Sequence, residues 1–120
     1  MKTFPDKLTL QVKQPCKCIS MLYITQLIYI QEGKEQTFHE FEDIAIPVIS
    51  KYNGRLLLRI RPVANSIIYT DGPSPYEVHL ISFETQQDFD AFKQDAERKK
   101  FLHLKEESVK SSLLIQGLAI

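Results

Sequence analysis

The chain has 120 residues, of which 43% are apolar and 25% are charged, a composition typical of a single globular domain. Its 15 basic residues balance its 15 acidic residues, so no global field attracts nucleic acid or an anionic membrane. The longest apolar runs fall well short of the roughly 20 residues that span a bilayer, and the first residues lack the pattern of a secretory signal. We therefore expect a cytoplasmic protein with no nucleic-acid partner and no membrane partner.

Residues 1–20 differ in pattern from the rest of the chain. Pro5 and Pro15 bracket a short polar and apolar alternation, which is consistent with either a flexible arm or an added edge strand. Met21 stands immediately before the first strong strand. We therefore expect an N-terminal extension over residues 1–20 and a folded domain over residues 21–120.

The first two elements of this domain are predicted from their periodicity. Residues 22–30 are rich in β-branched and aromatic side chains on both alternating faces, which predicts a strand covered on both sides. Residues 34–52 repeat apolar side chains at steps of three and four, which predicts a helix with a kink or break at Pro47. Glu42 falls away from this apolar stripe. Asn53-Gly54 then ends the helix, because glycine adopts the left-handed conformation at little cost and asparagine tolerates it better than most residues.

A strand begins directly after this turn, over residues 55–61. Its alternation puts Leu56, Leu58 and Ile60 on one face and Arg59, with other basic residues, on the opposite face. The basic face needs water or acidic partners.

The next predicted strand, residues 76–83, has no fully polar face. If Val78 and Leu80 join the leucine face of the preceding strand in the helix-covered core, His79 shares the face of Arg59. The two polar side chains would then lie on the side of the sheet away from the helices.

The remaining elements complete a recognisable plan. Residues 63–75 form the longest loop, Thr85 begins a capping box, a second short helix lies around Phe101, and residues 112–118 form the last strand. The order predicts an α+β fold, the ferredoxin-like β-α-β-β-α-β plan with an antiparallel sheet. Its helices cover only one side of the sheet, while the strands are apolar on both faces. We therefore expect a homodimer, in which a second copy covers the far face.

From residue 21 to residue 117 the pattern resembles a family of small bacterial proteins, the domain of unknown function 1330 family, within the dimeric α+β-barrel superfamily. The residues that carry the resemblance are Pro47 within the first helix, Lys51-Tyr52-x-Gly54-Arg55, Arg59, Pro62, the strand ending at Phe83, and the helix with Phe89 and Phe92. The resemblance implies two ferredoxin-like units that pair their sheets face to face as a dimeric α+β barrel. It implies no activity, because the wider superfamily is varied and fold alone does not choose among its chemistries.

Four strand residues are candidates for ligand binding: Tyr23, Arg59, Glu77 and His79. A guanidinium group in mid-strand on a partly buried face needs a partner, so Arg59 either forms a structural ion pair, for example with Glu77, or binds a ligand carboxylate. His79 is the candidate catalytic residue because histidine acts as a general base near neutral pH; its alternative is a hydrogen-bonded interface residue. Tyr23 either lines a pocket for an aromatic or quinone-like ligand, together with Tyr29 and Tyr76, or packs at the barrel interface.

Other polar residues carry weaker signals. Arg55 and Arg61 lie near strand ends and are expected in solvent, as are His39 and His103. No two histidines have the spacing of metal ligands, and Cys16 and Cys18 lack the second pair of a structural zinc site. No glycine-rich phosphate loop occurs either. We therefore expect no metal and no cofactor.

The residues leave two functions open. The first is a homodimer that binds a small anionic or aromatic molecule in a pocket of the barrel or between sheet and helices. The second is a cofactor-free monooxygenase or isomerase, in which Arg59 holds an anion and His79 transfers a proton. A deep pocket containing both residues would favour the enzyme.

Overall fold

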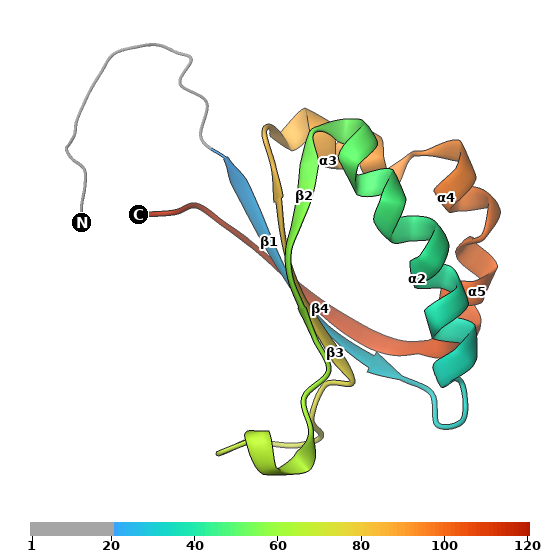
Figure 1. Ribbon diagram of the computed structural model, residues 1–120, viewed down its shortest axis with the longest axis vertical. Helices are drawn as coiled ribbons and strands as arrows, with labels where there is room; N and C mark the ends of the chain where they lie inside the picture. Colours follow the sequence, from blue (N-terminus) through green and yellow to red (C-terminus); the bar gives the residue numbers. More distant parts are fainter. Residues whose placement is uncertain (1–20) are drawn as a thin grey trace.

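The computed structural model describes residues 21–120, so the extension expected over residues 1–20, with Cys16 and Cys18, lies outside it. A four-stranded sheet forms one layer and the helices form a second layer on one side of it (Figure 1). No helix in the described part of the chain is long and apolar enough to cross a membrane.

The elements occur in the predicted order. The strands are β1 (Leu22–Ile30), β2 (Gly54–Ile60), β3 (Glu77–Phe83) and β4 (Val109–Gly117). The helices are α2 (Glu35–Ile49), α3 (Gln86–Lys93), α4 (Ala96–Lys100) and α5 (Leu102–Ser108), with 3₁₀ turns η1 (Ser50–Tyr52) and η2 (Ala64–Ser66). The strand order is β2-β3-β1-β4 and every hydrogen-bonded pair is antiparallel, which confirms the predicted α+β, ferredoxin-like sheet.

Helix α2 presents its apolar stripe to the sheet. Phe38, Phe41, Ala45, Val48 and Ile49 are all buried, as the three-and-four spacing requires. The α-helix runs through the proline at position 47 and tightens into η1 only after Ile49, so no break occurs at the proline.

The turn after η1 uses its two residues differently from the prediction. Asn53 adopts the left-handed conformation, with φ 58° and ψ 34°, while Gly54 already belongs to β2. The glycine is needed for close packing instead, because a side chain there would meet Ile49 and Phe83.

The predicted faces of β2 are wrong because of a β-bulge. Leu56 pairs with Ile81 and Leu58 pairs with Leu80, so Leu57 is an extra residue that shifts the alternation by one. Leu56 and Arg59 therefore face the helices, while Leu58 lies on the far face of the sheet.

The same register corrects the faces of β3. His79 pairs with Arg59 and shares its face, as predicted, but this face is the helix-covered one. Val78 and Leu80 lie on the far face with Leu58 and Ile60. Arg59 and His79 thus lie between the sheet and the helices, whereas Leu58, Ile60, Val78 and Leu80 lie on the far face of the sheet.

The C-terminal helical region forms three short helices and not one rod. Thr85 caps α3 by accepting a hydrogen bond from the Asp88 amide at 3.0 Å, which confirms the predicted cap. The Asp95 side chain accepts from the Arg98 amide at 2.9 Å and so begins α4. A further helix, α5, contains Leu104, where the sequence predicts one.

Gly54 offers a direct test of packing at the turn. In Gly54→Ala the added Cβ would lie 2.6 Å from Ile49 Cγ2, 2.6 Å from Phe83 Cε1 and 2.9 Å from the Ile49 carbonyl oxygen. We expect a loss of about 1–3 kcal/mol in the free energy of unfolding, measured by urea denaturation, because a packed core resists overfilling. Gly117→Ala is the matched control, since nothing lies within 4 Å of its Cβ. Equal stability of the two variants would contradict this role for Gly54.

Candidate functional site

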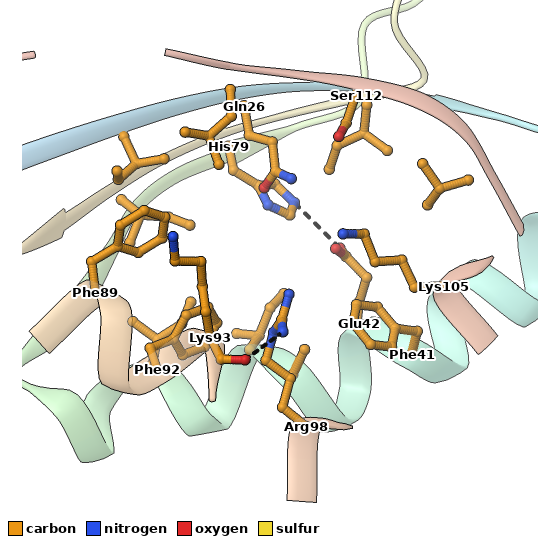
Figure 2. A pocket seen from close by; sticks show the side chains of 18 of the residues that line it. Gln26, Phe41, Glu42, His79, Phe89, Phe92, Lys93, Arg98, Lys105 and Ser112 are labelled. Atoms are coloured by element: carbon orange, nitrogen blue, oxygen red, sulfur yellow. Dashed lines mark hydrogen bonds and ion pairs between the residues drawn. The ribbon is translucent and has the colours of Figure 1, made fainter. Parts of the chain in front are cut away.

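A cavity of about 170 Å³ lies between the sheet and the helices (Figure 2). Its walls are mainly apolar and include Ile24, Ile28, Phe41, Phe89 and Phe92. A dry cavity of about 150 Å³ is large enough to bind benzene, so this space admits at least one small ring. The polar side chains that line it fall into two groups, one based on the sheet and one based on the helices.

His79 is the central residue of the sheet-based group. It points from β3 toward the helices and is 3% exposed. Its Nε2 atom lies 2.5 Å from Glu77 Oε2 and 3.2 Å from Glu42 Oε1, so one imidazole nitrogen faces two carboxyl groups. Gln26 of β1 and Ser112 of β4 line the cavity beside it.

Two arginines, Arg59 of β2 and Arg61 just after its end, form ion pairs with these carboxyl groups. Arg59 Nε donates to Glu77 Oε2 at 2.9 Å, and Arg61 Nε donates to Glu77 Oε1 at 2.6 Å. The Nη2 atom of Arg59 also lies 3.0 Å from Glu42 Oε1. The ion pair between Arg59 and Glu77 that the sequence suggests is therefore present. Arg61 is exposed to solvent, as expected, and it also pairs with the fully buried Glu77, because the bulge puts both arginines on the same face as this carboxylate.

The electrostatics of this group result from burial and pairing. Burial lowers the pKa of His79, but the close contacts with the Glu42 and Glu77 carboxyl groups and their charges outweigh it and raise the pKa to about 9. Burial raises the pKa of Glu42 to about 7, although the contact with His79 and its charge act in the opposite direction. Burial also favours a higher pKa for Glu77, yet its contacts with His79, Glu42 and the two arginines hold the pKa well below its ordinary value.

Glu42, Glu77 and His79 also form the kind of cluster that holds metal ions. Their ligand atoms lie within 4.8 Å of one another, although Glu42 is far in sequence from Glu77 and His79. Both oxygens of Glu77 already accept from guanidinium groups, and Arg59 also contacts Glu42. The positive charge of two arginines opposes a divalent cation, so this donor set fits a shared proton better than a metal.

The helix-based group is cationic. Lys93 of α3, Arg98 of α4 and Lys105 of α5 point into the cavity from the helices (Figure 2). Burial lowers the pKa of Arg98, although the charge of Asp95 acts in the opposite direction. Burial together with the charge of Arg98 lowers the pKa of Lys105, although the charge of Glu106 acts in the opposite direction. Among residues 21–120, neither Arg98 nor Lys105 forms a side-chain ion pair with a carboxylate.

The short helices fix these cations by local contacts. The Arg98 guanidinium lies 5.1 Å from the Phe92 ring centroid and donates from Nη1 to the Lys93 carbonyl at 3.3 Å. Asp95, which caps α4, accepts a hydrogen bond from the Tyr52 hydroxyl at 2.6 Å. The start of α4 is thereby tied to the end of the first helical segment, which sets the direction of Arg98.

The sequence candidates are only partly brought together. His79 lines the cavity, whereas Arg59 and Glu77 do not. Glu77 contacts His79, and Arg59 contacts both Glu77 and Glu42. Tyr23 pairs with Ser82 on the far face of the sheet, away from the cavity. Tyr29 and Tyr76 line a second, more open hollow of about 460 Å³, where Tyr76 also contacts His39.

Sequence reasoning missed most of the polar residues that line the cavity: Gln26, Glu42, Lys93, Arg98, Lys105 and Ser112. Glu42 was expected away from the apolar stripe, yet it is 5% exposed. A signal existed, since Glu42 lies four residues after Phe38 and three before Ala45, on the buried face of α2. No comparable signal marks Arg98 or Lys105, because their directions depend on the breaks between α3, α4 and α5.

Comparison with known proteins supports the fold and no finer assignment. No family model matches this sequence, so the resemblance to the domain of unknown function 1330 family stays a prediction. No curated relative matches either.

Solved structures do match across most of the chain. A NIPSNAP family protein from Agrobacterium tumefaciens is 16% identical with a TM-score of 0.61, covering 90% of this chain and 93% of that one. A dimeric protein of unknown function and ferredoxin-like fold from Bacteroides fragilis is 11% identical with a TM-score of 0.62, covering 82% and 96%. A dabb family protein with a ferredoxin-like fold from Mesorhizobium loti is 13% identical with a TM-score of 0.59, covering 84% and 98%. At these identities the likeness concerns the fold alone.

The buried histidine predicts a pH dependence of stability. Between pH 6.5 and about 9 the native His79 keeps a proton that the unfolded chain releases, so the free energy of unfolding falls as pH rises. Glu42 acts in the same direction between pH 4.5 and about 7, because its native pKa is also raised. Urea melts across pH 6–9.5 should therefore show falling stability in the native sequence.

His79→Gln should flatten this decline, because glutamine does not titrate. His103→Gln is the control, since His103 is exposed on α5 and should leave the slope unchanged. A slope that is identical in all three proteins would contradict the assigned role of His79.

Proposed function

We propose that this chain forms a homodimer that binds a small, largely apolar anion, such as an aromatic or aliphatic carboxylate, in the cavity between sheet and helices. The observation that carries the proposal is the pair of partly buried cations, Arg98 and Lys105, on one largely apolar cavity. Two like charges in a partly desolvated space repel each other, and a bound carboxylate would relieve that repulsion.

The rest of the cavity is suited to such a ligand. Phe41, Phe89 and Phe92 offer ring faces and edges to an apolar body. Gln26 and Ser112 supply hydrogen-bonding groups at the sheet. The ligand would therefore place its charge toward the helices and its apolar part among the phenylalanines.

Arg59 does not serve as the anion site in this proposal. Its guanidinium is engaged by Glu42 and Glu77 and does not line the cavity. Arg98 and Lys105, and not Arg59, therefore bind the ligand carboxylate in this proposal. The enzymatic alternative, a monooxygenase or isomerase, retains His79 as a residue of the cavity.

A carboxylate panel tests the binding. Benzoate, phenylacetate and hexanoate should raise the melting temperature of the native chain; at ten times Kd the stabilisation is about 1.4 kcal/mol. This corresponds to roughly 6–11 °C in a domain of about 100 residues. Arg98→Met/Lys105→Met should abolish the shift, because the cations that hold the anion are gone.

Lys99→Met/Lys100→Met is the charge-matched control, since both lysines are exposed on α4 and lie outside the cavity lining. It should keep the full shift. A native chain that none of the carboxylates stabilises, or a shift that survives in the Arg98 and Lys105 variant, would refute the proposed site.

The dimer rests on the far face of the sheet. Its residues Leu58, Ile60, Leu113 and Ile115 are 48%, 44%, 53% and 49% exposed. They belong to β2 and β4, the two outer strands, so the exposed surface crosses the sheet. An apolar face of this kind fits a second copy of the same face around a two-fold axis.

Light scattering at micromolar concentration should give a mass of twice 13.9 kDa for the native chain. Leu113→Arg should shift the mass toward the monomer, because a charge would be buried in the interface. Ala91→Arg, exposed on α3, is the control and should remain dimeric. A native mass of 13.9 kDa would rule out the homodimer.

A further inference from the structure

Glu42 is a buried carboxyl group that the binding proposal does not use. It lies on α2 and lines the cavity. Its Oε1 atom has Arg59 and His79 at ion-pair distance, 3.0 and 3.2 Å, but forms no hydrogen bond of good geometry within residues 21–120. A buried carboxylate oxygen without a well-aligned donor keeps a lone pair that is available to a proton.

The groups around Glu42 are arranged as in an acid-base site. His79 faces it from β3, and Glu77 fixes the imidazole through the same Nε2 atom. Arg59 and Arg61 in turn fix Glu77 from the side of β2. A proton acceptor, a histidine beside it and a third group that orients the histidine are the parts of a proton-transfer site.

Proton removal from carbon also requires positive charge near the bound molecule, and the cations on the helix side supply it. A carbon next to a carbonyl group loses a proton only if the negative charge that moves onto the carbonyl oxygen is stabilised. Arg98 and Lys105 line the same cavity as Glu42 and His79, so positive charge is available on both sides of a bound molecule. The apolar walls lower the local dielectric and so strengthen each of these interactions.

We propose that Glu42 is the base of a proton-transfer site for small oxo acids, which bind through their carboxylate at Arg98 and Lys105 and present the carbon beside their carbonyl group to Glu42. This inference rests on the binding function proposed above. The class of reaction is enolisation, that is, keto-enol tautomerisation or the resulting shift of a double bond.

The step balances without a further reactant. The C–H bond breaks and its proton moves to the Glu42 carboxylate. The electron pair of that bond forms the new C=C bond, and the carbonyl π pair moves onto oxygen as the enolate. Return of a proton from Glu42 to the same carbon gives exchange with solvent, and return to another carbon gives an isomer. The raised pKa of Glu42, about 7, suits a base that works near neutral pH.

Solvent exchange measures this step directly. The full chain is incubated in deuterium oxide with phenylpyruvate, 2-oxobutanoate or acetoacetate, and loss of the proton signal beside the carbonyl group is followed by NMR. We expect the native chain to accelerate exchange of at least one oxo acid above the rate without protein. Glu42→Gln should lower the accelerated rate by at least about 100-fold, because general-base catalysis contributes about 10² to 10⁴.

Matched variants separate chemistry from folding. Asp43→Asn changes an adjacent exposed carboxylate on the same helix and should exchange as fast as the native chain. Glu42→Asp keeps a carboxylate one methylene further back and should retain a reduced rate, so it replaces Glu42→Gln if thermal melts show the latter to be unfolded.

Binding is measured in parallel by thermal shift with the same oxo acids and with benzoate. Glu42→Gln should keep the shift, since Arg98 and Lys105 are unchanged. If oxo acids stabilise the native chain but do not exchange faster, the role of Glu42 is overturned and the binding function remains. A Glu42→Gln variant that exchanges at the native rate has the same consequence. Absence of any shift with all the acids would overturn the binding function, and the inference with it.

Discussion

The structure depends on one buried contact, in which a single nitrogen of His79 faces the carboxyl groups of Glu42 and Glu77. Burying three ionisable groups costs free energy that their mutual attraction recovers only with good geometry and additional donors. Arg59 and Arg61 supply those donors to Glu77. The network thus joins α2, β2 and β3 beneath the helices. An apolar core of the same volume would often be as stable, so stability alone does not explain the polarity of this cluster.

The charge cluster depends on the bulge in β2. Without the bulge, the register set by the Leu56–Ile81 pair would continue regularly, so that Leu58 would pair with His79 and Arg59 would pair with Val78 on the far face. With it, Arg59 and Arg61 turn toward the helices, and Leu58 joins the exposed apolar surface. The bulge therefore places Arg59 and Arg61 on the helix side of the sheet, and Leu58 on the far side, where we propose the second copy.

The sequence predicts the elements well and their faces less well. Period and composition place β1 over residues 22–30, and the capping pattern at Thr85 places the start of α3, because both signals are local. The bulge leaves no such signal, since any residue of the alternation in β2 could be the extra one. The sequence correctly predicts that Arg59 and His79 share a face, but for this reason it places that face away from the helices, whereas the helices cover it. Glu42 was missed because its charge counts against burial, while its position on α2 places it on the buried face.

The cationic side of the cavity has a different origin, in the interruptions of the C-terminal helical region. In a single rod Arg98 and Lys105, which are seven positions apart, would share one face but lie about 10 Å apart along one axis. Here Asp95 starts a new helix, α4, and Phe101 starts α5. Each interruption changes the helix axis, so that Arg98 and Lys105, from two different helices, line the same cavity as Glu42. Because they are placed by two separate helix starts, a ligand that held both would also hold α4 against α5. Occupation of the cavity would then be coupled to the order of this region, and protection of its backbone amides from hydrogen exchange is where such coupling would be visible.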